Sequence, residues 1–498
     1  MLFNALEFWI FLPVVWLLYF SIPSKIRWVW LLCASYFFYG FWKIEFAGLM
    51  LITSLMDWYS AKRVHAASKI IWKRFWMWFA ISTDLFILFV FKYFDFAFGK
   101  SELAYSLYHN NSTAWIIELG KYTIPAGISF YTFQSISYVV DVYRGNEQPE
   151  KNPIKFMLFV SFFPQLVAGP IERFGRLHQQ LFQKYSPKLE DLKNGGRLLL
   201  YGLFLKVAIA DNLAGVVDAF YSNPADYSVS SAWLAALLFT FQVYYDFFGY
   251  SLLAQGAALL FGIKLMDNFN KPFIAQSVPE FWHRWHISLS TWFRDYIFIP
   301  VGGNQKGAMR LAFGVLLVFF TSGLWHGANS TMIYFGLSQG VLYLFDRFIF
   351  KKTLANFKIG IFFRQLKTGF FFMMTLVFFR SQSIDQSTGI YSMLFDINGK
   401  HAKTASETMV TTYNFDEAGK AISSNYGPKV LENLSAEFSI WLFLLIGFLL
   451  DHLIMKSRAD SWFASLPLLI RWVAYLFMLV AVLLFGGAVN HPFVYFQF

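Results

Sequence analysis

Charged side chains are scarce in this sequence. Asp, Glu, Lys and Arg make up only 14% of its 498 residues, whereas a soluble globular protein has about 25% charged residues. The hydrophobic residues, 57% of the chain, gather in runs of about 17 to 25, the length that crosses the hydrocarbon core of a bilayer. These features predict an all-α polytopic membrane protein. They exclude a soluble enzyme and a nucleic-acid-binding domain.

The sequence lacks the residues that several kinds of site need, namely disulfides, metal sites and serine acyl-enzymes. The single cysteine, Cys33, excludes an internal disulfide and a thiolate metal cluster, and no HExxH or CxxC pattern indicates a metal site. The absence of a G-x-S-x-G elbow argues against a hydrolase-like serine acyl-enzyme. An internal repeat, which many secondary transporters have, is also missing. Because no long linker or low-complexity tract interrupts the chain, we expect a single membrane domain over residues 1–498.

Twelve apolar segments are candidate membrane spans. Several are short or interrupted, so we expect about eleven or twelve crossings, with re-entrant and interfacial helices among them. The first segment has no basic residues before it and no small-residue cleavage site, so it is predicted to be a retained span and not a signal peptide. The candidates are Leu6–Ile22, Ile26–Phe41, Phe46–Tyr59, Phe75–Phe94, Tyr122–Val140, Leu198–Phe220, Trp233–Phe261, Leu311–Trp325, Met332–Phe350, Ile361–Phe379, Phe438–Ile454 and Leu468–Val489.

The basic residues predict an orientation. The chain has 41 Lys and Arg against 30 Asp and Glu, and in membrane proteins such an excess gathers in short cytoplasmic loops. The basic stretch Lys62–Arg74 is therefore predicted to be cytoplasmic, which puts the N-terminus and the loop Lys100–Glu118 outside. Regions Arg173–Arg197 and Lys264–Arg310 are predicted to be cytoplasmic or at the membrane surface. The polar segment Asp396–Glu437 is expected to form a small extracytoplasmic excursion.

The segment Ser277–Tyr296, SVPEFWHRWHISLSTWFRDY, stands out from the apolar background. Ser277 and Glu280 have the spacing of a capping box, and Pro279 suits a first helical turn. On a continuous helix the large apolar residues would fall within about 120°, with His286 at the edge of their stripe. Spacing alone favours an amphipathic helix in the membrane interface over a functional histidine.

A second histidine ends an apolar run in Thr321–Asn329, TSGLWHGAN. Gly323 and Gly327 flank His326, and such small residues let a ligand or a neighbouring helix approach the backbone closely. An ionisable group at membrane depth is a functional candidate by default. The alternative, a histidine that is merely hydrogen-bonded between helices, is equally compatible with this pattern.

Two further segments mix Gly and Pro with apolar residues: Pro125–Tyr138, PAGISFYTFQSISY, and Phe162–Pro170, FFPQLVAGP. They are predicted to be broken or re-entrant, because such backbone is tolerated at membrane depth only where it lines a cavity or is buried in protein.

Taken in order, these strings and others resemble one family. The matching strings are MLFNALEFWIFLPVVWLLYF at the start, ASYFFYGFW (Ala34–Trp42), PAGISFYTFQSISYVVDVYRG (Pro125–Gly145), FVSFFPQLVAGPIER (Phe159–Arg173), YYDFFGYS (Tyr244–Ser251), EFWHRWHISLSTWFRDY, TSGLWHGAN, FFRS (Phe378–Ser381) and FVYFQF (Phe493–Phe498). Their order and coverage resemble the membrane-bound O-acyltransferase family, and within it the bacterial alginate O-acetyltransferase branch. The resemblance implies the fold of that family.

The resemblance also implies site residues. His326, in the WHG string, would be the catalytic histidine and His286 its companion. A neutral imidazole with a pKa near 6.5 suits the chemistry, because it takes the proton from a hydroxyl group that attacks a thioester. The branch usually has an arginine where this chain has His283, so His283 inherits no role.

The implied function is an O-acetyltransferase of the bacterial inner membrane. It would use cytoplasmic acetyl-CoA as substrate, with no bound cofactor and no metal, and deliver acetyl across the membrane to an extracytoplasmic polysaccharide such as alginate. A periplasmic or surface acetyltransferase would be its partner protein, with membrane lipid around the chain. Arg173, Arg284 and Arg294 are candidates for the CoA phosphates, or else belong to a solvated face.

Two other functions stay open at this point. One is a lipid or protein O-acyltransferase of the same superfamily, and the other is a transporter or flippase.

Tyr495 carries the one hydroxyl of the string Phe493–Phe498, FVYFQF. Composition alone favours an aromatic anchor at the membrane interface. The string also resembles a C-terminal motif of acyl-handling systems in this family, which implies that Tyr495 relays the acyl group. A phenol is a competent acceptor once a base removes its proton, so Tyr495 joins the two histidines as a candidate catalytic residue.

Overall fold

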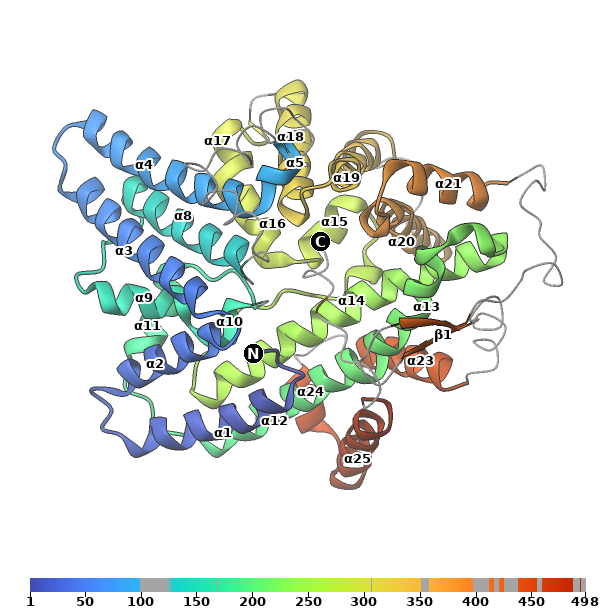
Figure 1. Cartoon of the computed structure of the whole chain (residues 1–498), viewed down its shortest axis with the longest axis horizontal. Coiled ribbons are helices and arrows are strands. Elements are labelled where there is room, and N and C mark those ends of the chain that lie inside the picture. Colours follow the sequence, from blue (N-terminus) through green and yellow to red (C-terminus); the bar gives the residue numbers. More distant parts are fainter. Residues whose placement is uncertain are drawn as a thin grey trace. The chain divides into compact units, whose positions relative to one another are not determined.

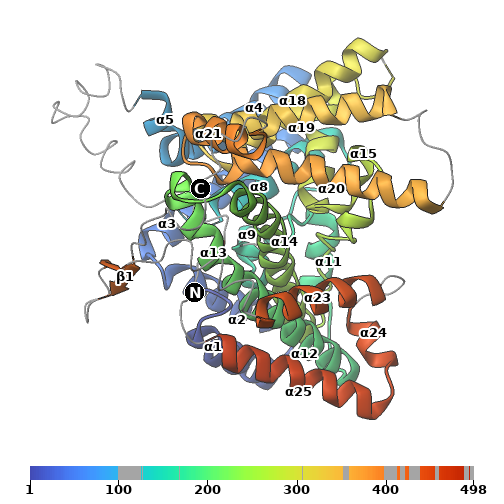
Figure 2. The same ribbon diagram turned by 90° about the vertical axis from the view of Figure 1, so that its right-hand side faces the viewer.

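The computed structural model describes residues 1–98, 125, 127–167, 169–305, 307–350, 358–396, 412–415, 421–424, 438–454, 459–486 and 493. Within these ranges the chain is almost entirely helical (Figure 1; Figure 2), as predicted. The strands in these ranges are β1 (Thr412–Phe415) and β2 (Ala421–Ser424), which pair antiparallel with Asn414 opposite Ile422. Both belong to the predicted excursion Asp396–Glu437, most of which lies outside the described residues.

Within the described residues, each of the twelve predicted spans is largely helical. The helices are α1 (Leu6–Ser21), α2 (Arg27–Gly40), α3 (Ile44–Ala66), α4 (Ile70–Leu88), α8 (Ile128–Arg144), α12 (Leu189–Leu203), α13 (Asp211–Ser222), α14 (Val229–Leu260), α18 (Ala308–His326), α19 (Ser330–Phe348), α20 (Lys358–Arg380), α23 (Phe438–Leu453) and α25 (Leu468–Phe485). Five described helical segments are long and apolar enough to cross a membrane, namely Ile70–Tyr93, Leu189–Ser222, Ala308–His326, Gly360–Arg380 and Leu468–Phe485. The chain is therefore a multi-pass membrane protein, while its sidedness stays a prediction.

Shorter elements join these helices. The described π-helical segments are η1 (Phe89–Tyr93), η2 (Phe204–Ala210) and η5 (Arg294–Phe298), and the 3-10 turns are η3 (Pro224–Asp226) and η4 (Pro272–Ile274). The short α-helices are α5 (Phe94–Phe98), α9 (Pro153–Ser161), α10 (Phe163–Leu166), α11 (Phe174–Phe182), α15 (Val278–Arg284), α16 (Ile287–Phe293), α17 (Ile299–Val301), α21 (Ile384–Leu394) and α24 (Ala459–Ser465).

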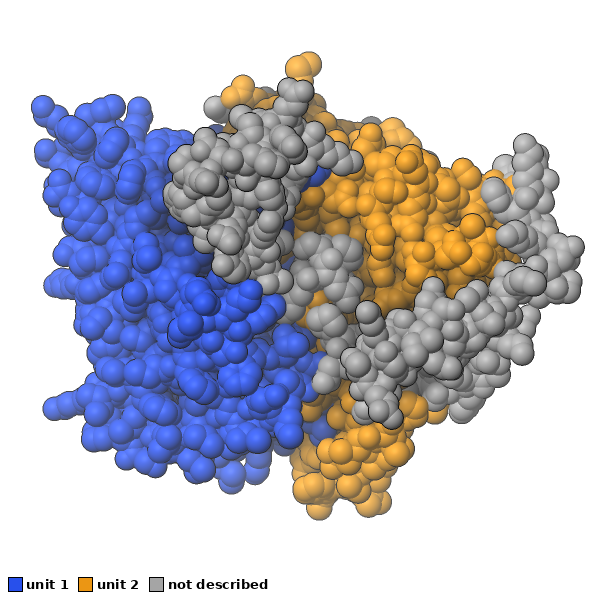
Figure 3. All heavy atoms as spheres, in the orientation of Figure 1, with its two compact units in different colours: residues 1–200, 250–268, 286–300 blue, residues 201–249, 269–285, 301–498 orange. Residues whose placement is uncertain are grey.

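The chain groups into two compact units (Figure 3). Unit 1 comprises Met1–Leu200, Tyr250–Asn268 and His286–Pro300, and unit 2 comprises Tyr201–Gly249, Phe269–Trp285 and Val301–Phe498. In unit 1, helix α3 packs against α4, α8 and α9, and in unit 2, helix α19 packs against α18 and α20. The single membrane domain over residues 1–498 stays a prediction.

The segment Ser277–Tyr296 is not one helix. Helix α15 ends at Arg284 and α16 begins at Ile287, because His286 between them has a left-handed backbone with φ 43° and ψ 54°. The predicted interfacial stripe is therefore wrong. Its large apolar residues are also buried in the protein, including Phe281, Trp282, Trp285, Leu289, Trp292 and Phe293.

The predicted Ser277 cap at the start of this segment is confirmed, while the Glu280 carboxylate bonds the residue before the cap and not Ser277 itself. The Ser277 hydroxyl accepts a hydrogen bond from the Glu280 N–H at 3.2 Å, and the Glu280 carboxylate accepts one from the Gln276 N–H at 2.9 Å. Local spacing thus predicted the beginning of α15 correctly, since a cap depends only on neighbours in the sequence.

The segment Phe162–Pro170 is broken and buried, as predicted. Phe162 interrupts the helix between α9 and α10, and the side-chain amides of Gln134 and Gln165 both donate to the Phe159 carbonyl, at 3.1 and 2.9 Å. In Pro125–Tyr138 helix α8 begins after Gly127, whose φ is 75°, and it is continuous over Ile128–Tyr138, so the predicted break is wrong for those residues. The hydrogen bonds from Gln134 and Gln165 satisfy the Phe159 carbonyl, which a continuous helix would have bonded within itself.

A buried ion triad occupies the membrane-embedded part of unit 2. Lys206, on η2, lies 2.7 Å from a carboxylate oxygen of Asp211 and 2.6 Å from one of Asp246. The Lys206 and Asp246 side chains are both 1% exposed. Lys206 lies on the π-helical turn η2, between the two carboxylates. Its positive charge stabilises them, because an unpaired charge is strongly disfavoured inside a membrane protein.

We expect Lys206→Met to destabilise the protein by about 3–5 kcal/mol, because two buried carboxylates then lose their cation. Thermal unfolding of purified protein in detergent measures the effect. Lys193→Met removes an exposed lysine from the neighbouring helix α12 and should leave the midpoint unchanged. A Lys206→Met midpoint equal to that of Lys193→Met would contradict the role of the triad.

Candidate active site

His326 is the last residue of helix α18 in unit 2. Its side chain is 5% exposed. The imidazole lies among the rings of Trp325, Phe335 and Phe379, with centroid distances of 4.9, 5.8 and 5.3 Å. An ionisable group enclosed by aromatic rings inside a membrane protein is a functional candidate.

Glycines bring α18 and α19 close together. A Cβ atom on Gly323 would collide with the Met332 carbonyl oxygen, and one on Gly336 would collide with the Phe319 carbonyl oxygen. This close approach agrees with the prediction made from the small residues that flank His326. It fixes the end of α18, and with it the His326 backbone, against α19.

The loop after His326 is tied to the end of α20. Asn329 caps α19 by accepting from the Thr331 N–H at 3.3 Å, and its amide donates to the Gln382 carbonyl at 3.0 Å. The Thr331 hydroxyl donates to the Ser381 carbonyl at 3.3 Å. Together with the His326–Phe379 ring contact, these bonds bring the strings TSGLWHGAN and FFRS together in space, which their separation in the sequence does not predict.

His286 is the residue before helix α16 in unit 1, and its side chain is 1% exposed. A left-handed backbone is uncommon outside glycine, and such strained conformations cluster at functional sites. The ring of Phe130 lies 6.4 Å away between centroids. The strain and the burial together make His286 the second candidate.

Asn268 holds the backbone on which His286 sits. Its carbonyl accepts from the Ile287 N–H at 2.9 Å, and its side-chain oxygen accepts from the Ser288 hydroxyl at 2.6 Å. Its amide nitrogen donates to the Ser251 hydroxyl at 3.1 Å. The sequence analysis did not single out Asn268, because a lone polar residue in a loop carries no signal of its own.

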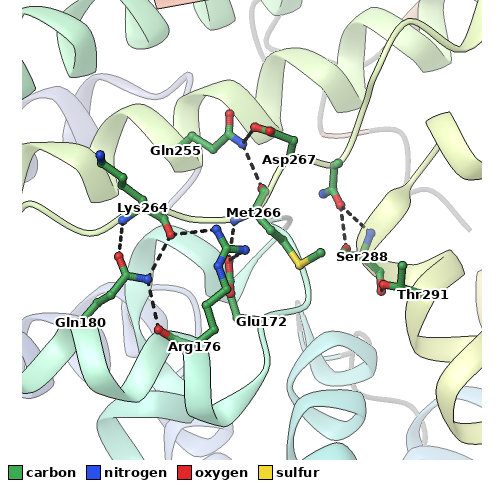
Figure 4. Close-up of polar contacts among 10 residues, drawn as sticks. Glu172, Arg176, Gln180, Gln255, Lys264, Met266, Asp267, Ser288 and Thr291 are labelled. Carbon is green, nitrogen blue, oxygen red and sulfur yellow. Dashed lines mark hydrogen bonds and ion pairs between the residues drawn. The ribbon is translucent and has the colours of Figure 1, made fainter. Parts of the chain in front are cut away.

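The loop that leads into Asn268 is fixed by side chains from the region around α11 (Figure 4). Glu172 accepts from the Met266 N–H at 2.6 Å, and the Gln180 side chain accepts from the Lys264 N–H at 2.8 Å. Glu172 belongs to the string FVSFFPQLVAGPIER, so this contact links that string to the His286 region.

Burial raises the pKa of Glu172 from its ordinary value of 4.5 to about 7, because the carboxylate loses hydration. The folded protein then keeps a proton that the unfolded chain releases, so stability falls as pH rises from about 4.5 to 7. We expect the thermal midpoint of the wild type to fall over this window relative to Glu172→Gln, whose amide does not titrate. Parallel pH curves for the two proteins would contradict this expectation.

The arginines predicted to meet CoA phosphates separate between the units. Arg284, in unit 2, forms an ion pair with Glu280 of its own helix, with 2.9 Å between the guanidinium nitrogen and the carboxylate oxygen. In unit 1, Arg173 and Arg294 both approach the Asp295 carboxylate, at 3.6 and 2.8 Å. Arg144 joins them by donating to the Asp295 carbonyl at 3.1 Å. Sequence reasoning missed Arg144, since a single basic residue at a helix end is common.

Comparisons with known proteins identify the family. Residues 151–384 match the model of the membrane-bound O-acyltransferase family. A probable alginate O-acetylase of Azotobacter vinelandii is 33% identical over 98% of this chain and 98% of its own length. This chain belongs to the membrane-bound O-acyltransferase family. The resemblance predicted from the motifs is therefore confirmed.

Other relatives act on different glycans according to their names. A peptidoglycan O-acetyltransferase of Helicobacter pylori is 30% identical over 100% of this chain and 98% of its own length. A teichoic acid D-alanyltransferase of Bacillus subtilis is 30% identical over 43% of this chain and 57% of its own length. The protein is thus a membrane-bound O-acyltransferase.

The candidate residues of this acyltransferase lie in different parts of the structure. His286 and His326 both fall within residues 151–384, and they belong to different units. Tyr495 lies outside the described residues. Phe493, two residues earlier, is buried in unit 2, where its ring centroid lies 5.5 Å from that of Phe247. The catalytic roles of the three candidates stay predictions.

We expect His286→Gly and His286→Asn to lower acyl transfer by about 10²-fold, the smaller end of the range for general acid–base groups. Both residues tolerate the left-handed backbone, so the loss would report on the imidazole and not on strain. Single-turnover assays with folded, purified protein measure it. Full activity in both variants would assign His286 a purely conformational role.

Proposed function

We propose that this acyltransferase takes acetyl from cytoplasmic acetyl-CoA and passes it across the bacterial inner membrane for O-acetylation of an extracytoplasmic polysaccharide. A periplasmic or surface acetyltransferase is its partner protein in this proposal. The observation that supports it most is the enclosed His326 at the meeting point of the strings TSGLWHGAN and FFRS. The relative of Azotobacter vinelandii, similar over nearly its whole length, is named an alginate O-acetylase.

The proposed chemistry uses His326 as a general base. Its neutral imidazole takes the proton from the acceptor hydroxyl as the oxygen attacks the thioester carbonyl carbon. The carbon–sulfur bond breaks, and the imidazolium returns the proton to the CoA thiolate. An enclosure of aromatic rings supports this role, because it excludes the water that would otherwise hydrolyse the thioester.

The proposed donor contact lies in unit 1. Arg144, Arg173 and Arg294 gather around Asp295, and guanidinium groups bind phosphate oxygens in a fork geometry. The pantetheine diphosphate and the ribose phosphate of CoA offer such oxygens. The region around Arg173 is also predicted to face the cytoplasm, where acetyl-CoA is made.

A donor competition tests the proposal. Purified protein in proteoliposomes receives acetyl-CoA or a long-chain acyl-CoA from the side of Lys62–Arg74, and CoA release and acyl transfer to added polysaccharide are measured. We expect transfer from acetyl-CoA. Preference for the long-chain donor would indicate a lipid or protein acyltransferase, and substrate movement that survives His326→Ala would indicate a transporter.

A further inference from the structure

Two aspartates are buried between membrane helices of unit 1. Asp57 on α3 is 0% exposed and Asp84 on α4 is 2% exposed. Helices α3 and α4 pack against each other and against α8, as Figure 1 also shows. The two carboxyl groups lie close enough to interact electrostatically. Two ionised carboxylates at one apolar site are strongly disfavoured, so their charge must be neutralised.

No cation from the described part of the chain neutralises the pair. Neither Asp57 nor Asp84 forms an ion pair with a lysine, arginine or histidine in these residues. The groups of α8 that interact with the pair are uncharged: Ser135 forms a hydrogen bond with Asp57, and Tyr138 and Tyr131 interact electrostatically with Asp57 and Asp84. The triad around Lys206 is different, because there the lysine is ion-paired with the carboxylates of both Asp211 and Asp246.

Several polar atoms around the pair lack hydrogen-bond partners in the described ranges. They include one carboxylate oxygen of each aspartate and the Ser60 hydroxyl, while Ser135 is a hydrogen-bond partner of Asp57. Ser60 is fully buried and follows Asp57 by three residues on α3, so the two side chains share one helix face. Buried polar atoms are nearly always satisfied, and such a concentration of exceptions indicates a bound group.

We propose that Asp57 and Asp84 form a proton-binding site between α3, α4 and α8. The pair holds at least one proton at neutral pH, which removes the repulsion between the carboxylates. The Ser135 hydroxyl, a hydrogen-bond partner of Asp57, donates to the carboxylate that stays ionised. This site is separate from acyl transfer, in which the proton taken by the base returns to the leaving thiolate.

The ligand chemistry distinguishes a proton from a metal ion. The groups present are two carboxyls and hydroxyls, all oxygen, which also suits a small hard cation such as Na⁺. A proton fits better here, because it neutralises the pair without a coordination shell. The test therefore includes an arm with sodium.

Dicyclohexylcarbodiimide labelling tests the site, since this apolar reagent modifies protonated carboxyl groups. The full chain in lipid vesicles is labelled over a range of pH, and the adduct is located by mass spectrometry. We expect an adduct on Asp57 or Asp84 that declines about tenfold per pH unit above the apparent pKa of the pair. The double variant Asp57→Asn, Asp84→Asn should lose it, while Asp385→Asn, at an exposed carboxyl, should retain it.

Infrared spectra of the same proteins give a second reading that needs no reagent access. We expect a carbonyl band of a protonated carboxyl at neutral pH in the wild type, and its loss in the double variant. Suppression of labelling by Na⁺ would show that the site binds sodium and would overturn the proposal that it binds a proton. Absence of both the adduct and the band would overturn the site itself, whatever the acyltransferase assays show.

Discussion

His326→Ala is expected to abolish acyl transfer while the protein still folds and inserts into the membrane. The alanine removes the group that takes the acceptor proton, and general-base catalysis alone contributes about 10²–10⁴-fold to a rate. His326 is the last residue of α18, and the glycine contacts between α18 and α19 remain in the variant. The loss should therefore appear in the rate and not in the yield.

Acetylation of the polysaccharide and CoA release, measured on equal amounts of folded protein, check this result. His283→Ala is the matched control, because it removes an exposed histidine from the same protein. It should keep wild-type activity. Near-normal transfer by His326→Ala would remove the histidine from the mechanism and leave it a packing residue between α18, α19 and α20.

Tyr495→Phe is expected to stop polysaccharide acetylation if Tyr495 relays the acyl group, as the resemblance of the C-terminal string implies. In that step the phenol oxygen attacks the thioester carbonyl, CoA leaves as the thiol, and an aryl ester forms that is activated for transfer to a partner hydroxyl. Phe493, two residues before Tyr495, is buried. Phenylalanine keeps the ring and removes only the hydroxyl.

Mass spectrometry provides the decisive measurement for Tyr495. An acetyl group should appear on the peptide that contains Tyr495 after incubation with acetyl-CoA, and it should be absent in Tyr495→Phe and in His326→Ala. Phe496→Leu is the control, since it changes a neighbouring ring and keeps the hydroxyl. Wild-type acetylation by Tyr495→Phe would make Tyr495 an anchor and assign the relay to the partner protein.

The sequence predicted the features that depend on neighbours along the chain. All twelve apolar segments became helices, because apolar run length and hydrogen-bond satisfaction leave few alternatives. Ser277 caps α15 as its spacing required, and Gly323, near His326, marked a close helix contact. The order of short strings was enough to predict the family, which the comparisons confirmed.

The prediction of an interfacial helix was wrong, because it assumed that Ser277–Tyr296 forms a single helix. The stripe over Ser277–Tyr296 presupposed a continuous helical period, but the left-handed backbone at His286 resets that period between α15 and α16. The residues of the stripe are buried in protein and not spread on a membrane surface, because period alone does not state which partner covers an apolar face.

The sequence by itself determined the class of protein, the helices and two histidines worth testing. Tertiary structure alone decided how Asn268 and Glu172 hold the His286 region, and that Lys206 meets two carboxylates. It also decided that Asp57 and Asp84, on successive helices, share one buried site. Those groupings join residues on separate helices and loops, and they arise from the burial of polar groups that must find partners wherever the packed helices bring them together.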